Sequence, residues 1–302
     1  MLSIGMEACP GYRLTKRLGQ GGFGDVWEGS SPDGRKFALK FLDIRHQPPG
    51  SVATEIKLLL TLRDLKHPNL IQLENIVTLP NAIVLIMELA DGSLHDLHYV
   101  YRQDYKSNIP PQVLCNLLGQ AAAGLDFMAV QRLPGIRTFS PTGLQHCDVK
   151  PSNLLLSGKV VKVVDFGLSG PKSWGQGRNV IMGTPPYAAP ELYEGKPGER
   201  TDQFGLAVSY YELRTGKLPY EVPKELAFPA GGPDLSLLPE SERQIVGKAL
   251  SRRWLDRWPS CTDFMKALTE AIEKDIKAVA DAERQAALRK KPASSASHII
   301  QA

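Results

Sequence analysis

Up to about residue 90, the alternation of hydrophobic and polar positions predicts short strands joined by tight turns. Leu14, Lys16 and Leu18 alternate with polar or basic neighbours, which is the two-residue period of a strand. A Ser-Pro-Asp-Gly sequence at 31–34 indicates a turn. Further strands are expected at 36–42, around 70–77 and at 82–88, and a helix with Ser51 as its N-cap is expected at 51–65.

From about residue 93, the pattern changes to the spacing of helices. A long apolar helix with proline at its start is expected at 110–130, and a second helix that ends at a glycine is expected at 201–216. Two short strands and a glycine-rich stretch typical of a mobile loop lie between these helices, at 153–156, 161–165 and 167–183.

The expected organisation is a small β-rich lobe at about 12–90 and a larger, mainly helical lobe at about 91–268, which is an α+β fold. Residues 1–11 are expected to be an N-terminal extension. Residues 269–302 are charged and rich in alanine, which predicts a weakly amphipathic helix and a disordered tail. An anionic surface is an alternative partner for this helix, but its mixed charges favour solvent.

Composition and charge exclude several classes of function. The chain has 302 residues and a formal net charge of +4, which is spread along the chain, so no nucleic acid partner is expected. The longest apolar run, 82–90, is too short to cross a bilayer, and the N-terminus lacks the pattern of a signal peptide. The four cysteines form no CxxC pair, which favours a reducing, cytoplasmic location over a disulfide framework or a zinc ribbon.

Gly19, Gly21 and Gly24 have the GxGxxG spacing of a loop whose backbone N–H groups approach phosphate oxygens. The dinucleotide-binding fold uses the same spacing, and Asp43 lies where that fingerprint has an acid. That fold requires a helix after the third glycine, however, and the turn at 31–34 predicts a strand instead. A plain hairpin turn is the remaining alternative.

Lys40 lies in the predicted strand 36–42, with Ala38 on the same face. A lysine buried in this apolar strand requires an acidic partner, and Glu55 on the following helix is suitable. The alternative is an exposed lysine on an edge strand.

The segment 144–156 combines His, Cys, Asp, Lys and Asn within a few positions. Asp148 and Asn153 lie five residues apart before a strand, and Asp165 follows the next strand. Two carboxylates and an amide oxygen are hard donors that suit Mg²⁺ and not zinc. The segment therefore predicts a site for a metal and phosphate, without a nucleophile.

At this point the chain resembles the eukaryotic-type protein kinases, over roughly residues 12–268. The resemblance depends on the order and spacing of GQGGFG, FALK, HCDVKPSN, DFG, GTPPYAAPE and TDQFG. The stretch 201–220 is most similar to bacterial Ser/Thr kinases. The resemblance implies a bilobal protein kinase fold and an ATP- and Mg²⁺-dependent transfer of phosphate to a protein.

The resemblance also implies the roles of individual residues. Met87 is the implied gatekeeper, and the backbone from Glu88 to Ala90 is implied to bond the adenine edge. Catalytic positions are implied at Lys40, Glu55, Asp148 and Lys150, and metal ligands at Asn153 and Asp165. Nucleotide-binding positions are implied at Gly19, Gly21, Gly24, Val26, Ala38, Lys40, Met87, Glu88, Ala90 and Leu155.

Lys150 and Thr184 resemble the Ser/Thr branch, in which the Thr184 hydroxyl would bridge Asp148 and Lys150; an ordinary loop phosphosite is the alternative for Thr184. Architectural contacts are implied from Asp202 to the loop at His146 and Cys147, between Glu191 and Arg257, and along a hydrophobic column of Leu59, Leu73, His146 and Phe166.

Cys147 stands where most of the family has an arginine that grips a phosphorylated activation loop. A thiol cannot do this, and the loop offers only Ser169 and Ser173 as acceptors. Activity is therefore expected not to depend on phosphorylation of this loop. A redox switch at Cys147 is the alternative, but the carboxylate of Asp148 disfavours the thiolate.

Three functions compete. An active Ser/Thr kinase is favoured over a pseudokinase that acts by docking, because Lys40, Asp148 and Asp165 are all retained. A small-molecule kinase is disfavoured by GTPPYAAPE, a peptide-docking segment. The long stretches 99–111 and 129–145 and the pair His95 and His98 are expected to be solvated surface, with a docking site and a zinc site as the alternatives.

Overall fold

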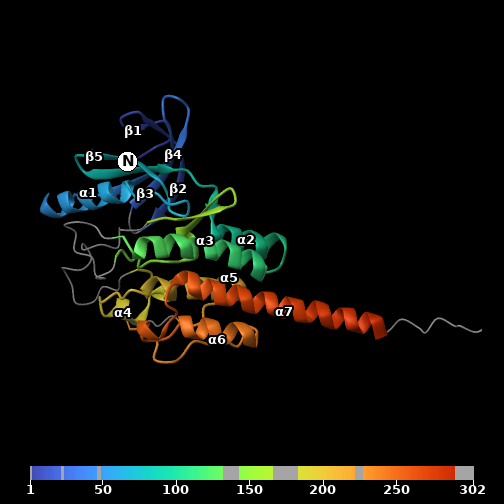
Figure 1. Cartoon of the computed structure of the whole chain (residues 1–302). Coiled ribbons are helices and arrows are strands. Elements are labelled where there is room, and N and C mark those ends of the chain that lie inside the picture. The colour runs from blue at the N-terminus through green and yellow to red at the C-terminus, as the bar shows by residue number, and fades with distance from the viewer. Residues whose placement is uncertain are drawn as a thin grey trace, which may run out of the picture.

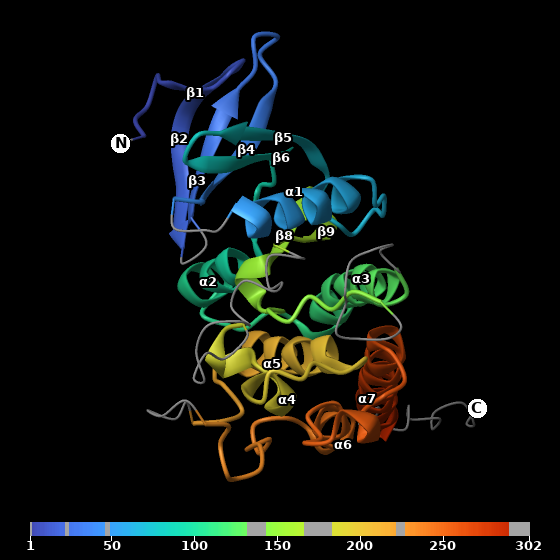
Figure 2. The ribbon, with the colours of Figure 1, turned by 90° about the vertical axis from the view of Figure 1, so that its left-hand side faces the viewer.

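The computed structural model describes residues 2–21, 24–45, 49–131, 143–165, 183–221 and 227–289. These residues form two lobes, one above the other in Figures 1 and 2, with strands dominating the N-terminal lobe and helices the C-terminal lobe. The bilobal α+β fold that the sequence predicts is therefore confirmed.

An antiparallel six-stranded sheet in the order β1-β2-β3-β4-β6-β5 forms the N-terminal lobe. Its strands are β1 Glu7–Cys9, β2 Tyr12–Gly21, β3 Gly24–Ser30, β4 Lys36–Asp43, β5 Leu73–Leu79 and β6 Ala82–Glu88. These bounds confirm the predicted strands. The helix α1, Pro49–Arg63, contacts β5.

The expected N-cap of this helix is wrong. The helix begins at Pro49, so Ser51 lies inside its first turn. Proline suits the first helical position because its missing N–H would have no partner there and its φ is already helical.

Alternate residues of the central strands form an apolar core in this lobe. Leu39, Val84 and Ile86 are fully buried there, beside Trp27. Cys9 of β1 joins this core at 2% exposure. Residues 7–9, in the predicted N-terminal extension, thus pair with β2 and bury a side chain in the lobe.

The C-terminal lobe combines helices with a small sheet in the order β7-β8-β9. Its helices are α2 Leu94–Asp104, α3 Pro111–Ala129, α4 Pro190–Tyr193, α5 Thr201–Thr215, α6 Glu240–Ala249 and α7 Cys261–Arg289. Its strands are β7 Gly92–Ser93, β8 Leu154–Ser157 and β9 Val160–Val163, and its short 3₁₀ turns are η1 Pro151–Asn153, η3 Pro185–Tyr187 and η4 Trp254–Asp256. The helices expected at 110–130 and 201–216 are confirmed as α3 and α5.

The helix α5 is the centre of this lobe. Phe204, Tyr210 and Tyr211 are each at most 1% exposed and point in different directions around the helix. A helix that is apolar on all sides is a buried helix. Gly216, at φ 77°, ends it in the left-handed conformation that favours glycine.

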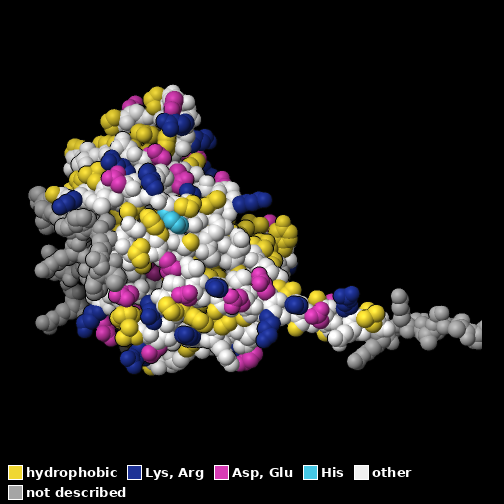
Figure 3. All heavy atoms as spheres, viewed as in Figure 1, with side chains coloured by type: hydrophobic (Ala, Val, Ile, Leu, Met, Phe, Trp, Pro, Cys, Tyr) yellow, Lys and Arg dark blue, Asp and Glu magenta, His cyan; other side chains and the backbone are white. Residues whose placement is uncertain are grey.

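The last helix leaves the body of the protein. One face of the helix is buried up to Ile272, and the side chains from Glu273 to Leu288 are all exposed. Figures 1 and 3 show this second half projecting from the C-terminal lobe, with both signs of charge along it. The helix begins at Cys261 and continues without a break through residue 268, where the boundary of the C-terminal lobe was expected. In the part of the chain that the structure describes, none of the helices has the length and apolar character needed to span a bilayer.

Candidate active site

The glycine-rich segment lies in a hairpin between β2 and β3, where Gly21 pairs with Gly24. The chain therefore continues into a strand after the third glycine. This excludes the dinucleotide-binding fold, which continues into a helix. The tip residues between these two glycines lie outside the described part of the chain.

Gly24 cannot be replaced without strain. Its φ is +122°, and a Cβ atom built on it would lie 1.9 Å from the carbonyl oxygen of Phe41 on β4. The third glycine of the motif is therefore fixed by the close approach of two strands as well as by any ligand.

We expect Gly24→Ala to lower the free energy of unfolding by about 3 kcal/mol, from backbone strain and overpacking together. Gly34→Ala is the matched control, because Gly34 also has a positive φ (+84°) but no atom within 4 Å of its Cβ position. Its expected loss is about 1 kcal/mol. Urea unfolding measures both, and equal losses would contradict this explanation.

The residues expected around adenine come from four strands, β3, β4, β6 and β8, and from the segment after β6. Ala38 pairs with Met87 and Val26 with Lys40 in the sheet register. Leu155, from β8 of the other lobe, packs against the same apolar cluster as Ala38. Glu88 ends β6, and Ala90 follows it as the chain enters the C-terminal lobe.

Met87 lines a small cavity of about 30 Å³, which lies between residues of α1 and residues of β5 and β6. Leu59, Leu73 and Asp165 line the same cavity. Leu59 and Leu73 are thereby placed together as expected, while Phe166 of the expected column lies outside the described residues.

Lys40 is buried at 3% exposure, and its Nζ lies 2.7 Å from Oδ2 of Asp165. A buried ammonium needs such a carboxylate to offset its lost hydration. Lys40 is thus not an exposed lysine on an edge strand. Glu55 lies on α1, but its side chain is outside the described part of the structure.

Asp165 is one of three described non-glycine residues with a positive φ, at 68°. A left-handed backbone costs free energy for such a residue and is often retained at functional sites. It directs the carboxylate of the C-terminal lobe to the lysine of the N-terminal lobe. The ion pair therefore joins two expected site residues that are 125 positions apart in the sequence, as the numbers of Lys40 and Asp165 show.

Asp148 is 6% exposed, and its carboxylate accepts from two side chains. Its Oδ2 accepts from Lys150 Nζ at 2.9 Å and from Asn153 Nδ2 at 3.0 Å. Its Oδ1 is buried and has no hydrogen-bond partner among the residues that the structure describes. Lys150 also donates to the Thr184 hydroxyl at 2.5 Å. The Thr184 hydroxyl was expected to bridge Asp148 and Lys150, but in the structure the Lys150 ammonium bridges Asp148 and Thr184.

Asp202 and His146 each make two contacts that fix the loop carrying Asp148. Asp202 of α5 accepts from the backbone N–H of His146 at 2.7 Å and of Cys147 at 2.8 Å, as predicted. The His146 ring contacts the Val164 carbonyl through Nε2 at 2.7 Å and accepts from Asp148 N through Nδ1 at 3.1 Å. These contacts tie the loop to α5 and to the end of β9.

Cys147 has a left-handed backbone, with φ 64°, and is 6% exposed. Burial, and then the charges of Asp202, Glu191 and Asp148, raise the pKa of its thiol well above the ordinary value. Gly183 packs on this residue so closely that a Cβ there would lie 2.2 Å from the Cys147 carbonyl oxygen. Gly183 is the first residue of the GTPPYAAPE motif, and this close approach gives it a steric role beside the loop.

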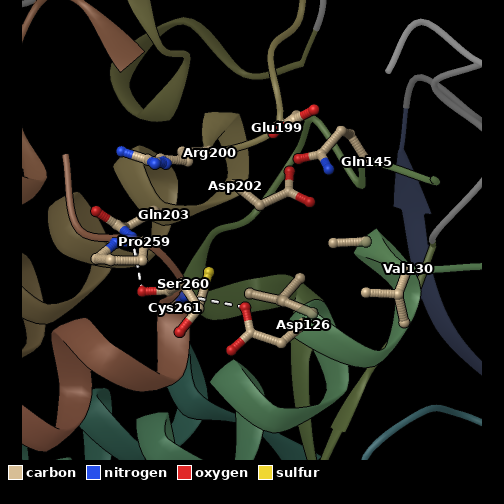
Figure 4. A pocket seen from close by; sticks show the side chains of 12 residues that line it. Asp126, Val130, Gln145, Glu199, Arg200, Asp202, Gln203, Pro259, Ser260 and Cys261 are labelled. Carbon is tan, nitrogen blue, oxygen red and sulfur yellow. Dashed lines mark hydrogen bonds between the residues drawn. The ribbon is translucent and has the colours of Figure 1, made fainter. Parts of the chain in front are cut away.

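A cavity of about 260 Å³ lies behind this loop. Figure 4 shows Asp126 and Cys261 joined at one end of it, with Gln145 and Asp202 at the other. Asp126 accepts from the backbone N–H groups of Cys261 and Thr262 and so caps the start of α7. The cavity is therefore lined by residues with structural contacts, since Asp126 caps α7 and Asp202 holds the loop at His146.

Beneath the site, Arg257 is fully buried and forms a two-pronged ion pair with Glu191, as predicted. Its NH1 and NH2 lie 2.7 Å and 2.8 Å from the two carboxylate oxygens. Thr201 donates to the same carboxylate at 2.8 Å. This pair connects α4 to the segment before α7.

The donor set fits Mg²⁺. The amide nitrogen of Asn153 donates to the carbonyl and to the carboxylate of Asp148, which leaves the amide oxygen for a cation. Val164 N donates to the Asn153 carbonyl at 3.0 Å, so Asp165 follows directly beside Asn153. One amide and one carboxylate oxygen are hard ligands. No group of three or more His, Cys, Asp or Glu side chains that could hold a metal is found within the described ranges.

The other expectations concern surface segments. In the stretch 99–111, Tyr99 and Tyr105 are exposed, at 62% and 69%, but the expectation of a solvated surface is wrong for Ile109, which is 1% exposed and packs in the core. Residues 132–142 of the stretch 129–145 lie outside the described part of the chain. His95 is exposed, and His98 contacts Asn108 at 3.4 Å.

Comparisons with known proteins agree with this geometry. Residues 12–274 match the protein kinase domain. The chain is 32% identical over 218 residues to sucrose non-fermenting protein kinase 1 of Fusarium virguliforme, covering 70% of this chain and 28% of that protein. It is 30% identical over 217 residues to a probable myosin light chain kinase of Dictyostelium discoideum, covering 69% and 51%.

A third relative is serine/threonine-protein kinase D3 of Homo sapiens, which is 28% identical over 242 residues, 77% of this chain and 25% of that protein. The matched region spans between 25% and 51% of these relatives, all of which are eukaryotic, so the similarity to bacterial kinases stays a prediction. The match over residues 12–274, together with the two lobes and the residues at their junction, shows that the chain belongs to the protein kinase family.

Proposed function

We propose that this chain is an active Ser/Thr protein kinase that transfers the γ-phosphoryl group of ATP to a protein hydroxyl with Mg²⁺. The observation that carries the proposal is the convergence of Lys40, Asp165 and Asp148 at the junction of the lobes. Asp165 pairs with Lys40, and Asn153 connects Asp165 to Asp148, because its carbonyl accepts from Val164 N and its amide nitrogen donates to Asp148.

Each residue has a chemical task in this proposal. Lys40 neutralises phosphate charge, and Asn153 and Asp165 would hold a Mg²⁺ ion, which would supply positive charge against the phosphates. The free Oδ1 of Asp148 accepts the hydrogen bond of the substrate hydroxyl and orients its oxygen. Lys150, which already contacts Asp148, is placed to contact the transferred group.

Little covalent chemistry is required of the protein, because phosphoryl transfer proceeds through a loose transition state. Catalysis then depends on holding charges where charge develops. The network around Asp148 meets this need, since His146, Asn153 and Lys150 hold the residue from three sides. The contact between Lys150 and Thr184 supports assignment to the Ser/Thr branch.

The test is transfer of label from γ-labelled ATP with Mg²⁺ to the chain itself and to a generic basic protein. The proposal predicts labelled phosphoserine and phosphothreonine. Label found only on tyrosine, or only on small molecules, would contradict it.

We further propose that activity does not depend on a phosphorylated activation loop. Cys147 is buried and carries no positive charge, so the position cannot grip a phosphate. Ser169 and Ser173 lie outside the described residues. The variant with both serines replaced by alanine is expected to keep its rate of transfer, and a loss of more than about tenfold, or ~1.4 kcal/mol, would contradict the idea.

The redox alternative for Cys147 makes a different prediction. Burial raises the pKa of Cys9 and of Cys115 from the ordinary value of 9.0 to about 11, and it also raises the pKa of Cys147 well above that ordinary value. At pH 8 the thiolate fraction of a thiol with a pKa of about 11 is roughly a hundredfold smaller than for an ordinary thiol. The folded protein is therefore expected to react slowly with a thiol reagent, and to react rapidly in denaturant. Rapid labelling of Cys147 in the folded protein would favour a redox switch.

We also propose a cytoplasmic location, which the four unpaired cysteines support.

A further inference from the structure

An ion pair between the lobes is not explained by the roles given above. Lys162 of β9, in the C-terminal lobe, places its Nζ 2.9 Å from Oε1 of Glu88, the last residue of β6. The side chains are only 15% and 26% exposed. An ion pair that is partly shielded from water and salt is stronger than a fully exposed one.

Glu88 is held from the N-terminal lobe as well. Its Oε1 also accepts from the backbone N–H of Gln72 at 2.7 Å, and its own N–H donates to the Gln72 carbonyl at 3.0 Å. One carboxylate oxygen of Glu88 therefore receives a donor from each lobe. Both the side chain and the backbone N–H of Glu88 therefore make hydrogen bonds or ion pairs.

The backbone around Lys162 is held in place, because the residues on either side of it make hydrogen bonds to the segment at Asn69. Val163 N donates to the Asn69 carbonyl at 2.9 Å, and Ile71 N donates to the Val163 carbonyl at 2.9 Å. On the other side, Asn69 Nδ2 donates to the Val161 carbonyl at 3.0 Å. Figure 2 shows β9 between α1 above and α3 below, at the junction of the lobes.

We propose that Lys162 is a positioning residue for nucleotide binding. By holding the Glu88 carboxylate, it fixes the direction of the Glu88 backbone carbonyl and of the segment up to Ala90, to which the adenine edge is expected to bond. The inference rests on the proposed function, because the role of this backbone belongs to that function. A ligand that bonds a pre-ordered segment loses less conformational entropy on binding.

A matched control exists in the N-terminal lobe. Lys36 lies 3.0 Å from Glu28, so the two ion pairs have similar lengths, but this one joins adjacent strands of a single sheet. Lys36 is also more exposed, at 61%. Its replacement removes a lysine–glutamate pair without touching the connection between the lobes.

The experiment compares Lys162→Met, Lys162→Arg and Lys36→Met with the wild-type chain. Hydrogen exchange without nucleotide follows the amides of Gln72 and Glu88, and titration with ADP gives its Kd. We expect Lys162→Met to speed exchange at these amides about tenfold and to weaken ADP binding about fivefold. The KM for ATP should rise while kcat stays within about twofold. Lys162→Arg should restore most of the loss, and Lys36→Met should change neither quantity.

Each result has a separate meaning. Unchanged exchange at Gln72 and Glu88 in Lys162→Met would overturn the inference, whether or not the chain binds nucleotide. Faster exchange with an unchanged Kd for ADP would also overturn it, because the pair would then be structural only. A wild-type chain that binds no ADP would overturn the proposed function and with it the positioning role, and the exchange data would still show whether the pair holds the segment.

Discussion

Asp148→Asn is expected to lower kcat for phosphate transfer by about a thousandfold, or ~4 kcal/mol. Asparagine has the shape of aspartate and keeps a polar side chain near Lys150 and Asn153, which contact Asp148 at 2.9 Å and 3.0 Å. It removes the negative charge and the basic oxygen that faces the substrate hydroxyl. The loss should therefore appear in kcat, with the KM for ATP changed by less than about threefold.

Asp64→Asn is the control, because Asp64 is an exposed acid, 74% accessible, that follows the last residue of α1 and pairs with Arg63. It should leave kcat unchanged. Thermal unfolding of both variants shows whether they are folded. A folded Asp148→Asn variant with more than a tenth of the wild-type kcat would contradict the role given to Asp148.

Arg257→Leu is expected to lower the free energy of unfolding by about 3–5 kcal/mol, as for the breaking of other buried ion pairs. Arg257 is fully buried, and besides Glu191 it donates to the carbonyls of Ser251 and Arg200 at 3.0 Å each. Its loss leaves a buried carboxylate and two carbonyls without their donor. Within the described ranges, Thr201 is then the remaining side-chain donor to Glu191.

Urea unfolding measures this effect, and two variants interpret it. Arg253→Leu removes an exposed pair with Asp256, at 3.9 Å, and should cost less than about 1 kcal/mol. The double variant Glu191→Leu with Arg257→Leu should recover part of the loss, because no unpaired charge remains. Equal losses for Arg257→Leu and Arg253→Leu would show that burial of the pair is not the cause.

Much of the fold was predictable because each element carries its own pattern. The strand at Lys36–Asp43 is a short apolar run after a turn, and the helix at Thr201–Thr215 is a longer run that ends at a glycine. The strand β1 was not predictable, because it has three residues and exists only through pairing with β2. The start of α1 was also missed. Ser51 was expected to cap the helix, but the helix begins two positions earlier at Pro49, and proline is favoured at the first helical position.

Two contacts around the site were predicted from the sequence, those of Asp202 with the loop at His146 and of Glu191 with Arg257, and the structure shows both. Motif spacing indicated Asp148, Asn153 and Asp165, but no spacing predicts that Asp165 pairs with Lys40 in this structure. Lys162 was missed because its significance depends on Glu88, a residue from the other lobe. A lysine in a short strand has no signal of its own, and only the register of β9 against the segment at Asn69 reveals it.

The measurement that tests the central claim most directly is the number of phosphates that one purified chain transfers from ATP with Mg²⁺ to serine and threonine. The same preparation is examined by thermal unfolding with and without ATP. The account predicts many transfers per chain, none with Asp165→Ala, and stabilisation of the wild-type chain by ATP. Fewer than one transfer per chain, while ATP still raises the unfolding temperature, would contradict the account and identify the chain as a nucleotide-binding scaffold.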